Sequence, residues 1–179
     1  MKLLLKIWKF LSFSKFLRVM ILKTVNDQFL VGVTGVIFNH KNQVLVLKHT
    51  YRKTAWSLPG GYLKASEHPK VGLAREIEEE TGLKVKILKN IRTQTNHEGR
   101  LDMSYFGVYQ SGKFKSSEEV SHHKFVHENK LPKLMKDQYE QIAEALKRKK
   151  AHDLEQRIEK ISHFLPNLFR KAIRYNDPK

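Results

Sequence analysis

Two kinds of apolar spacing alternate along this chain, and their order predicts a mixed α/β fold. Runs rich in β-branched residues cover Phe29–Phe38 and Gln43–Lys48, a composition typical of strands. The polar segment Asn39–Asn42 lies between these runs and predicts a hairpin turn. Helical spacing follows over His68–Thr81, so strands are expected to alternate with helices in an α/β domain.

Residues suited to helix termini lie at both ends of that helical segment. Pro69 fits the first turn, where a missing N–H is tolerated, and Gly82 fits a left-handed cap after the last turn. The other elements expected in the middle of the chain are a turn at residues 56–61 (WSLPGG), strands at Lys84–Ile91 and Asp102–Tyr109, and a weaker strand at Glu119–Val126.

Helical spacing returns in the last part of the chain. Pro132 precedes a predicted helix from Lys133 to Lys150, whose inner stripe is expected to contain Leu134, Tyr139, Ile142 and Leu146. The pattern continues over Ala151–Tyr175, with an interruption expected at Pro166. We therefore expect three parts: an N-terminal amphipathic basic helical extension (residues 1–25), a central domain (26–150) and a C-terminal helical extension (151–179).

Apolar and basic residues are interleaved at the N-terminus. Lys6, Lys9, Lys15 and Arg18 interrupt every apolar run, so we expect neither a secretory leader, which needs about 7–15 unbroken apolar residues, nor a membrane span of roughly 20. The spacing favours one or two amphipathic helices, with one stripe formed by Leu3, Leu4, Ile7, Trp8 and Leu11 and a second by Phe13, Phe16, Leu17 and Met20. Residues 1–24 could dock on a membrane surface or a protein partner. The commoner alternative is packing on the helix's own domain or in a homodimer.

Composition and charge narrow the chemistry. The net charge of +16 either keeps the protein in solution or attracts polyanions such as nucleotides, RNA or anionic lipid. Residues 1–26 hold six basic side chains and no acidic one, which is the densest part of this excess. The absence of cysteine excludes disulfides, thiolate metal sites and cysteine nucleophiles, and it agrees with a cytoplasmic location.

Three carboxylates share one face of the helix predicted at His68–Thr81. Glu76, Glu79 and Glu80 follow the spacing i, i+3, i+4, which places them within about one turn of each other. Like charges at this spacing destabilise a helix, but a hard cation such as Mg²⁺ or Mn²⁺ reverses the effect because it prefers carboxylate oxygens. A solvated acidic helix is the alternative explanation.

The residues around these glutamates follow a longer pattern. Gly61–Leu83 resembles the Nudix box of the Nudix hydrolases, matching it at Gly61, Glu67, Arg75, Glu76, Ile77, Glu79, Glu80, Gly82 and Leu83. The resemblance covers about residues 29–150 and implies a Nudix α/β/α sandwich with a mixed β-sheet. It does not cover the first 25 residues.

The resemblance also implies roles for the matching residues. Glu79 and Glu80 match the principal ligands of Mg²⁺ or Mn²⁺, and Glu76 matches a further ligand or the carboxylate that holds the attacking water. Glu67 is expected to assist metal binding, and Gly61 to turn the loop beside the metal. Arg75 is expected to anchor a carboxylate through a bidentate ion pair.

Residues outside the box are needed for the base and for the substrate. Glu119 is our candidate for the general base, with Glu118, His122, His123 and His127 as alternatives. Tyr51, Arg52 and Trp56 are candidates for substrate binding, because a cation can contact phosphates and an aromatic ring can stack on a base.

Hydrolysis of a pyrophosphate bond is the function that the resemblance implies. We expect a nucleoside diphosphate linked to another group, such as ADP-ribose or a nucleotide sugar, to be cleaved to a nucleoside monophosphate and a phosphorylated fragment. Gly99 stands where ADP-ribose hydrolases are expected to have a proline, so ADP-ribose itself is in doubt. The alternatives are 5′-triphosphate RNA ends or dinucleoside polyphosphates, and a non-catalytic binding module.

Overall fold

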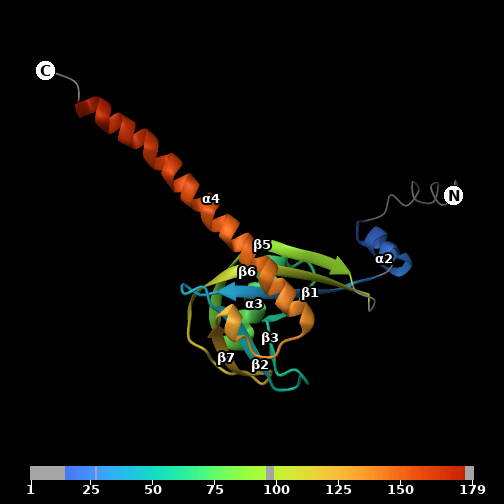
Figure 1. Cartoon of the computed structure of the whole chain (residues 1–179). Helices are drawn as coiled ribbons and strands as arrows, with labels where there is room; N and C mark the ends of the chain where they lie inside the picture. Colours follow the sequence, from blue (N-terminus) through green and yellow to red (C-terminus); the bar gives the residue numbers. More distant parts are fainter. Residues whose placement is uncertain (1–14, 27, 96–98, 176–179) are drawn as a thin grey trace.

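A mixed β-sheet forms the centre of the computed structural model, which describes residues 15–26, 28–95 and 99–175 (Figure 1). Its main path runs β3 (Trp56–Ser57), β2 (Val44–His49), β1 (Leu30–Phe38), β6 (Arg100–Gly112) and β5 (Leu83–Thr95). In addition, β4 (Gly60–Tyr62) pairs with β1, and β7 (Val120–Val126) pairs with β2. β1 and β6 are parallel, and the other strand pairs are antiparallel.

Two helices cover opposite faces of the sheet, and this confirms the predicted α/β/α sandwich. Because successive side chains of a strand point to opposite faces, β1 and β2 each contribute to two core clusters. One cluster lies under α3 (Pro69–Thr81), and the other lies under the first turns of α4 (Lys136–Tyr175). The first contains Val33, Ile37, Leu45, Leu47, Leu73 and Ile77; the second contains Val36, Phe38, Val44, Val46, Leu134, Ile142 and Ala145.

The local signals for the hairpin and for α3 are confirmed. Asn42 adopts a φ of 56°, and Asn39 Oδ1 accepts hydrogen bonds from the backbone N–H groups of Lys41 and Gln43. At the start of α3, His68 Nδ1 accepts a hydrogen bond from the N–H of Lys70. At its end, Gly82 adopts a φ of 70° in the left-handed region, where a side chain would be strained.

Four details of the predicted elements are wrong. Residues 56–61 form more than a turn, because β3 and the start of β4 pair with β2 and β1. β5 and β6 each extend to 13 residues, since their outer ends pair with each other and lack the apolar alternation that marks a covered strand. Tyr139 is exposed on α4 and not part of the inner stripe, because its hydroxyl donates a hydrogen bond to Pro132 O and accepts one from Leu134 N. The helix continues through Pro166, because a proline removes one helical hydrogen bond without having to end the helix.

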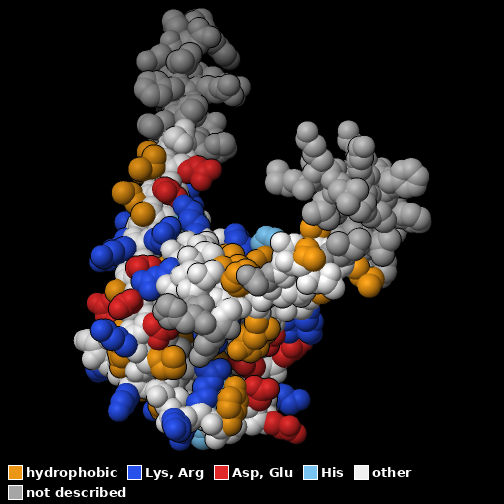
Figure 2. All heavy atoms as spheres, turned by 90° about the vertical axis from the view of Figure 1, so that its right-hand side faces the viewer, with side chains coloured by type: hydrophobic (Ala, Val, Ile, Leu, Met, Phe, Trp, Pro, Cys, Tyr) orange, Lys and Arg blue, Asp and Glu red, His pale blue; other side chains and the backbone are white. Residues whose placement is uncertain are grey.

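The ends of the described chain extend away from the sheet. α2 (Lys15–Val25) lies beside the domain, and the C-terminal half of α4 projects from it (Figure 1). Apolar side chains are exposed on both helices: Val19, Met20, Leu22 and Val25 on α2, and Leu154, Ile158 and Ile161 on α4 (Figure 2). The first predicted N-terminal stripe, Leu3 to Leu11, lies outside the described residues. In the described part of the chain, no helix is long and apolar enough to cross a membrane.

Ile77 should contribute strongly to stability because it is fully buried between α3 and the sheet. We expect Ile77→Ala to lower the free energy of unfolding by about 2–5 kcal/mol, since the truncation removes buried apolar surface and leaves a cavity. Urea unfolding followed by circular dichroism measures this loss. The control is Glu78→Ala on the exposed face of the same helix, and equal losses in the two variants would contradict the packing described here.

Candidate functional site

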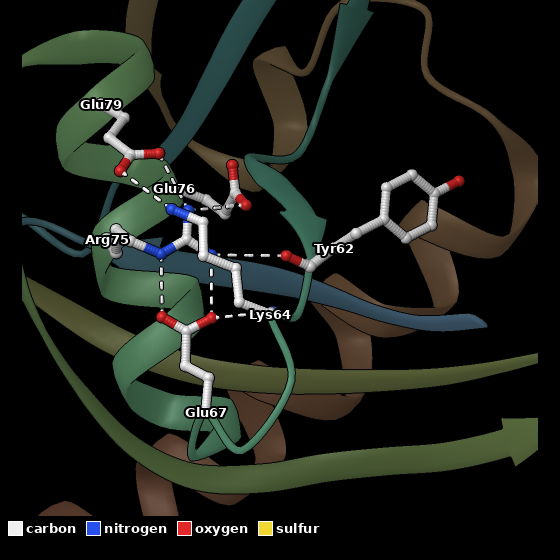
Figure 3. A network of polar contacts seen from close by, with 6 residues as sticks. All are labelled: Tyr62, Lys64, Glu67, Arg75, Glu76 and Glu79. Carbon is white, nitrogen blue, oxygen red and sulfur yellow. Dashed lines mark hydrogen bonds and ion pairs between the residues drawn. The ribbon is translucent and has the colours of Figure 1, made fainter. Parts of the chain in front are cut away.

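Arg75 is the centre of a network of acidic side chains on α3 and the loop before it (Figure 3). Its Nε and Nη2 donate to the two oxygens of Glu67 at 2.8 and 2.9 Å, which is a bidentate ion pair. Its Nη1 donates to Glu76 Oε1 at 2.9 Å and to Glu79 Oε2 at 2.8 Å. One guanidinium group therefore holds three carboxylates in place, and the anchoring geometry expected for Arg75 is present.

The charge of Arg75 also fixes the ionisation of Glu67. Hydrogen bonds from Arg75, and then from the backbone N–H of Lys64, lower the pKa of Glu67 to about 2. The same carboxylates raise the pKa of Arg75, chiefly through the pair with Glu67. Both partners are therefore charged at neutral pH.

Glycines allow the start of β4 to lie directly against β1 and the acidic helix. A Cβ on Gly61 would lie 2.5 Å from the carboxyl carbon of Glu76, and one on Gly60 would lie 2.2 Å from Val33 O. A side chain at either position would displace Glu76 or separate β4 from β1. Gly61 is thus beside the carboxylates, as expected.

Glu80 lies apart from the Arg75 network. Its Oε2 is buried and makes no hydrogen bond within the described residues. Burial, followed by the negative charges of Glu76 and Glu119, raises the pKa of Glu80 to about 7, and Arg52 opposes this rise. The carboxylate thus has a buried oxygen without a hydrogen bond and two further carboxylates nearby, and a bound cation would stabilise its charged form.

Glu119 is positioned by the loop that carries two of the predicted substrate residues. Thr50 donates from its backbone N–H to Glu119 O at 3.0 Å, and the Tyr51 hydroxyl donates to Glu119 Oε2 at 3.4 Å. Arg52 donates from Nη1 to Ser57 Oγ at 3.2 Å and from Nη2 to the Tyr51 hydroxyl at 3.4 Å. Strand pairing between β2 and β7 thus brings Glu119 to the residues that follow β2.

A cavity of about 500 Å³ extends from this loop and from Gly61 to the start of α4. Tyr51 and Arg52 line it, and so do residues that the sequence did not single out: Tyr62, Gln94, Arg100, Asp102, Ser104, Asp137, Gln138 and Gln141. Of these, Gln138 and Gln141 are recognisable in the sequence, because both are polar residues on the otherwise apolar inner face of the helix. This volume is within the range of small-molecule sites.

The other candidates lie elsewhere. Trp56 is outside the cavity lining; its ring packs on the core cluster under α4 and lies 4.9 Å from Lys124 Nζ. His122, His123 and His127 do not line the cavity either. Instead, the His123 ring stacks on Phe114 at 4.3 Å, and burial lowers its pKa. Among the predicted residues, Tyr51, Arg52 and Gly61 line the cavity. Glu76 lies against Gly61, and Glu119 lies against Tyr51.

The carboxylates of this site are of the type that a hard divalent cation prefers, although they are not grouped around one position. Within residues 15–26, 28–95 and 99–175, no three acidic or histidine side chains form a ready metal cluster. Arg75 explains this arrangement, because it holds Glu67, Glu76 and Glu79 toward its guanidinium. The Oε2 atom of Glu80 has no hydrogen bond within the described residues, and the negative charge of Glu76 lies nearby. A hard cation bound here would accept these carboxylate oxygens as ligands.

Known proteins share both the sequence pattern and the fold. The NUDIX domain profile matches residues 28–149. The chain belongs to the Nudix family. An ADP-ribose pyrophosphatase of Methanocaldococcus jannaschii is 31% identical over 114 residues, which are 60% of this chain and 67% of that protein. An RNA pyrophosphohydrolase of Zymomonas mobilis is 39% identical over 59 residues, 32% of this chain and 38% of that enzyme.

A third relative and two solved structures extend the comparison. A MutT-like protein of Streptomyces ambofaciens is 40% identical over 57 residues, which span 32% of this Nudix chain and only 36% of that protein. A UDP-X diphosphatase structure aligns over 79% of this chain and 73% of its own, with a TM-score of 0.63 and 21% identity. An ADP-ribose pyrophosphatase from Streptococcus suis aligns over 68% of this chain and 92% of its own, with a TM-score of 0.60 and 22% identity. These two structures support the Nudix fold.

Glu80 should make the stability of the metal-free protein depend on pH. Because its pKa rises from 4.5 to about 7 on folding, the folded protein binds more protons than the unfolded chain between these values. The free energy of unfolding should therefore fall as pH rises through this range, and Glu80→Gln should remove that part of the fall. Mg²⁺ should stabilise the wild type above pH 7, by about 2.7 kcal/mol at a hundredfold excess over its Kd.

Urea unfolding at several pH values, with and without Mg²⁺, measures both effects. Glu78→Gln is the control, because Glu78 is exposed and pairs only weakly, at 3.6 Å, with Lys84. If Glu80→Gln retained the wild-type pH dependence and the full response to Mg²⁺, both the burial of this carboxylate and its part in metal binding would be contradicted.

Proposed function

We propose that this Nudix chain hydrolyses a pyrophosphate bond in a nucleoside diphosphate linked to another group, with Mg²⁺ or Mn²⁺ as its cofactor. The observation that carries the proposal is the Glu80 carboxylate, whose Oε2 is buried without a hydrogen bond within the described residues and which is close enough to Glu76 and Glu119 to be affected by their charges. A cavity of about 500 Å³ lies beside Gly61 and is lined by Arg52, so a phosphate chain could lie next to these acids. The names of the relatives, which include ADP-ribose pyrophosphatase, support this substrate class.

Glu76, Glu79 and Glu80 are the residues that would hold the cation, with Glu67 in support. When bound, the cation would neutralise charge on the pyrophosphate oxygens and favour ionisation of the attacking water. Glu67 is committed to Arg75 through two hydrogen bonds, whereas Glu76 and Glu79 share a single nitrogen of that guanidinium. Glu76 and Glu79 are therefore the carboxylates that could turn toward a cation at lower cost, while Glu67 keeps Arg75 in place.

Glu119 and Arg52, which lie outside the acidic helix, would supply the remaining roles. Glu119 would accept a proton from the attacking water, because its carboxylate lies near Glu80 and is held by Tyr51. Arg52 would bind the phosphate chain, since it lines the cavity and its guanidinium donates hydrogen bonds to the neutral hydroxyls of Ser57 and Tyr51. The phosphoryl group would then be attacked between Glu119 and the acidic helix.

The net charge of +16 favours a second class of substrate, namely 5′-triphosphate RNA ends or dinucleoside polyphosphates. A polyanion of this kind would contact basic side chains outside the cavity as well as Arg52. A steep fall of kcat/KM with ionic strength would favour it, whereas a shallow dependence would favour the smaller nucleotide.

The N-terminal extension is the candidate for a contact with a membrane or another protein. Residues 1–26 carry six basic groups and no acidic one, and α2 exposes Val19, Met20, Leu22 and Val25. A basic helix with an exposed apolar side suits an anionic membrane surface. A homodimer that buries the apolar side chains of α2 and α4 is the alternative.

Glu79→Gln should lower kcat at least about a hundredfold while the protein stays folded, because the amide cannot serve as an anionic ligand. The substitution should leave circular dichroism unchanged, since Glu79 is exposed. Product formation from nucleoside diphosphate compounds, with Mg²⁺ or Mn²⁺ present and product masses recorded, provides the measurement. Glu78→Gln should retain nearly full activity, and normal turnover by Glu79→Gln would refute the assignment.

Deletion of residues 1–24 should abolish co-sedimentation with anionic lipid vesicles and leave hydrolysis intact. The reason is that the deleted segment carries the basic and apolar side chains, and none of its described residues, 15–24, lines the cavity. Vesicles of neutral lipid are the control. Equal binding by the full and shortened chains would contradict a membrane role, and precipitation of the shortened chain would show that the segment packs on the domain.

A further inference from the structure

Two buried amide side chains line the end of the cavity formed by α4. Gln138 and Gln141 are each only 6% exposed, and they lie on the face of α4 that also carries Ile142 and Ala145. Apolar residues would fill such positions in an ordinary core-facing helix. Buried amides need hydrogen-bond partners. An amide group that has no partner within the protein is therefore a candidate for binding a ligand.

Gln141 is paired within the protein. Its Oε1 accepts a hydrogen bond from Ser104 Oγ at 3.0 Å, and its Nε2 donates to Asp137 Oδ2 at 3.3 Å. Gln141 therefore ties α4 to β6 and holds Asp137 at the cavity wall. Its role is explained by these contacts.

Gln138 is oriented by the backbone but keeps an unused donor. Its Oε1 accepts a hydrogen bond from the N–H of Leu58 at 3.4 Å. Because a backbone N–H can only donate, the amide oxygen must face Leu58, and Nε2 is left on the other side. This nitrogen makes no hydrogen bond within the described residues, and Gln138 lines the cavity. The cavity thus contains a fixed donor with no partner of its own.

The surroundings of this donor suit an aromatic heterocycle better than a second phosphate. Asp137 lines the cavity next to Gln138 and would repel an anion there. Tyr51 and Met135 are exposed and also line the cavity, so they offer surfaces that a flat ring can cover. Gly61, which also lines the cavity, lies against Glu76 of the acidic helix, so the phosphates are expected beside Gly61 and Arg52.

We propose that Gln138 binds the nucleobase of the substrate, with its Nε2 donating to an acceptor atom of the base. A base edge carries an acceptor next to an N–H donor, and Asp137 can accept from the donor. This inference rests on the proposed function, because it assumes a nucleotide whose phosphates lie at the Gly61 end. It assigns specificity to a residue of α4, about 60 positions beyond the acidic helix in the sequence.

Gln138→Glu tests the inference because it replaces the donor with an acceptor and keeps the size of the side chain. A carboxylate can still accept from Leu58 N–H, so the helix should stay in place. A base acceptor would lose its partner, whereas a sugar hydroxyl could simply donate to the new oxygen. Gln156→Glu provides a matched control, since it makes the same change on the exposed, distal part of α4.

Calorimetric titration with the four nucleoside 5′-monophosphates and with ribose 5-phosphate, without metal, gives the readout. We expect Gln138→Glu to weaken at least one nucleotide by about tenfold or more and to leave ribose 5-phosphate unchanged. Gln156→Glu should bind every ligand like the wild type. Gln138→Met removes the donor without adding charge and should weaken the same nucleotide.

Three outcomes would overturn the inference. They are unchanged nucleotide affinity in Gln138→Glu, equal weakening of ribose 5-phosphate, and no nucleotide binding by the wild type. Failure of the proposed function would give a different result. A protein that binds nucleobases but hydrolyses no nucleotide would still lose nucleotide affinity in Gln138→Glu, while product formation would be absent.

Discussion

The site depends on one interaction, the contact of a single guanidinium with three carboxylates. Glu67, Glu76 and Glu79 would repel each other if Arg75 did not lie between them. The side chain of Arg75 is 19% exposed, so solvent screens these charges less than on an open surface. Glu80 makes no contact with Arg75 and keeps a buried oxygen without a hydrogen bond within the described residues. The site therefore contains three carboxylates that Arg75 holds and one that it does not.

Strand pairing determines which residues lie near Glu80. Pairing of β4 with β1 places the backbone of Gly61 directly against Glu76, and the close approach requires glycine. Pairing of β2 with β7 brings Glu119 to Tyr51, although the two residues are 68 positions apart. Strands distant in sequence thus supply both walls of the site, and α3 supplies only its acidic side. Removing either pairing would leave the glutamates as an ordinary charged helix surface.

α4 serves two purposes along its length of about 60 Å. Its first turns close one face of the sheet with Ile142 and Ala145, and they place Gln138 and Gln141 at the end of the cavity. Its later turns project from the domain and expose Leu154, Ile158 and Ile161. An element that stabilises the core is thereby also able to distinguish ligands and to contact another surface.

Local sequence determined the features whose physical cause is itself local. The spacing of Glu76, Glu79 and Glu80 places them on one part of a helix, the left-handed cap requires Gly82, and the polar turn at Asn39–Asn42 joins two apolar strands. Only the tertiary structure decided which charges act on Glu80, because Arg52 and Glu119 come from the loops after β2 and before β7. It also packed Trp56 against the core cluster under α4 and placed Gln138 in the cavity lining. Helical and strand periodicity state which side chains share a face, but they do not state what the rest of the chain places opposite that face.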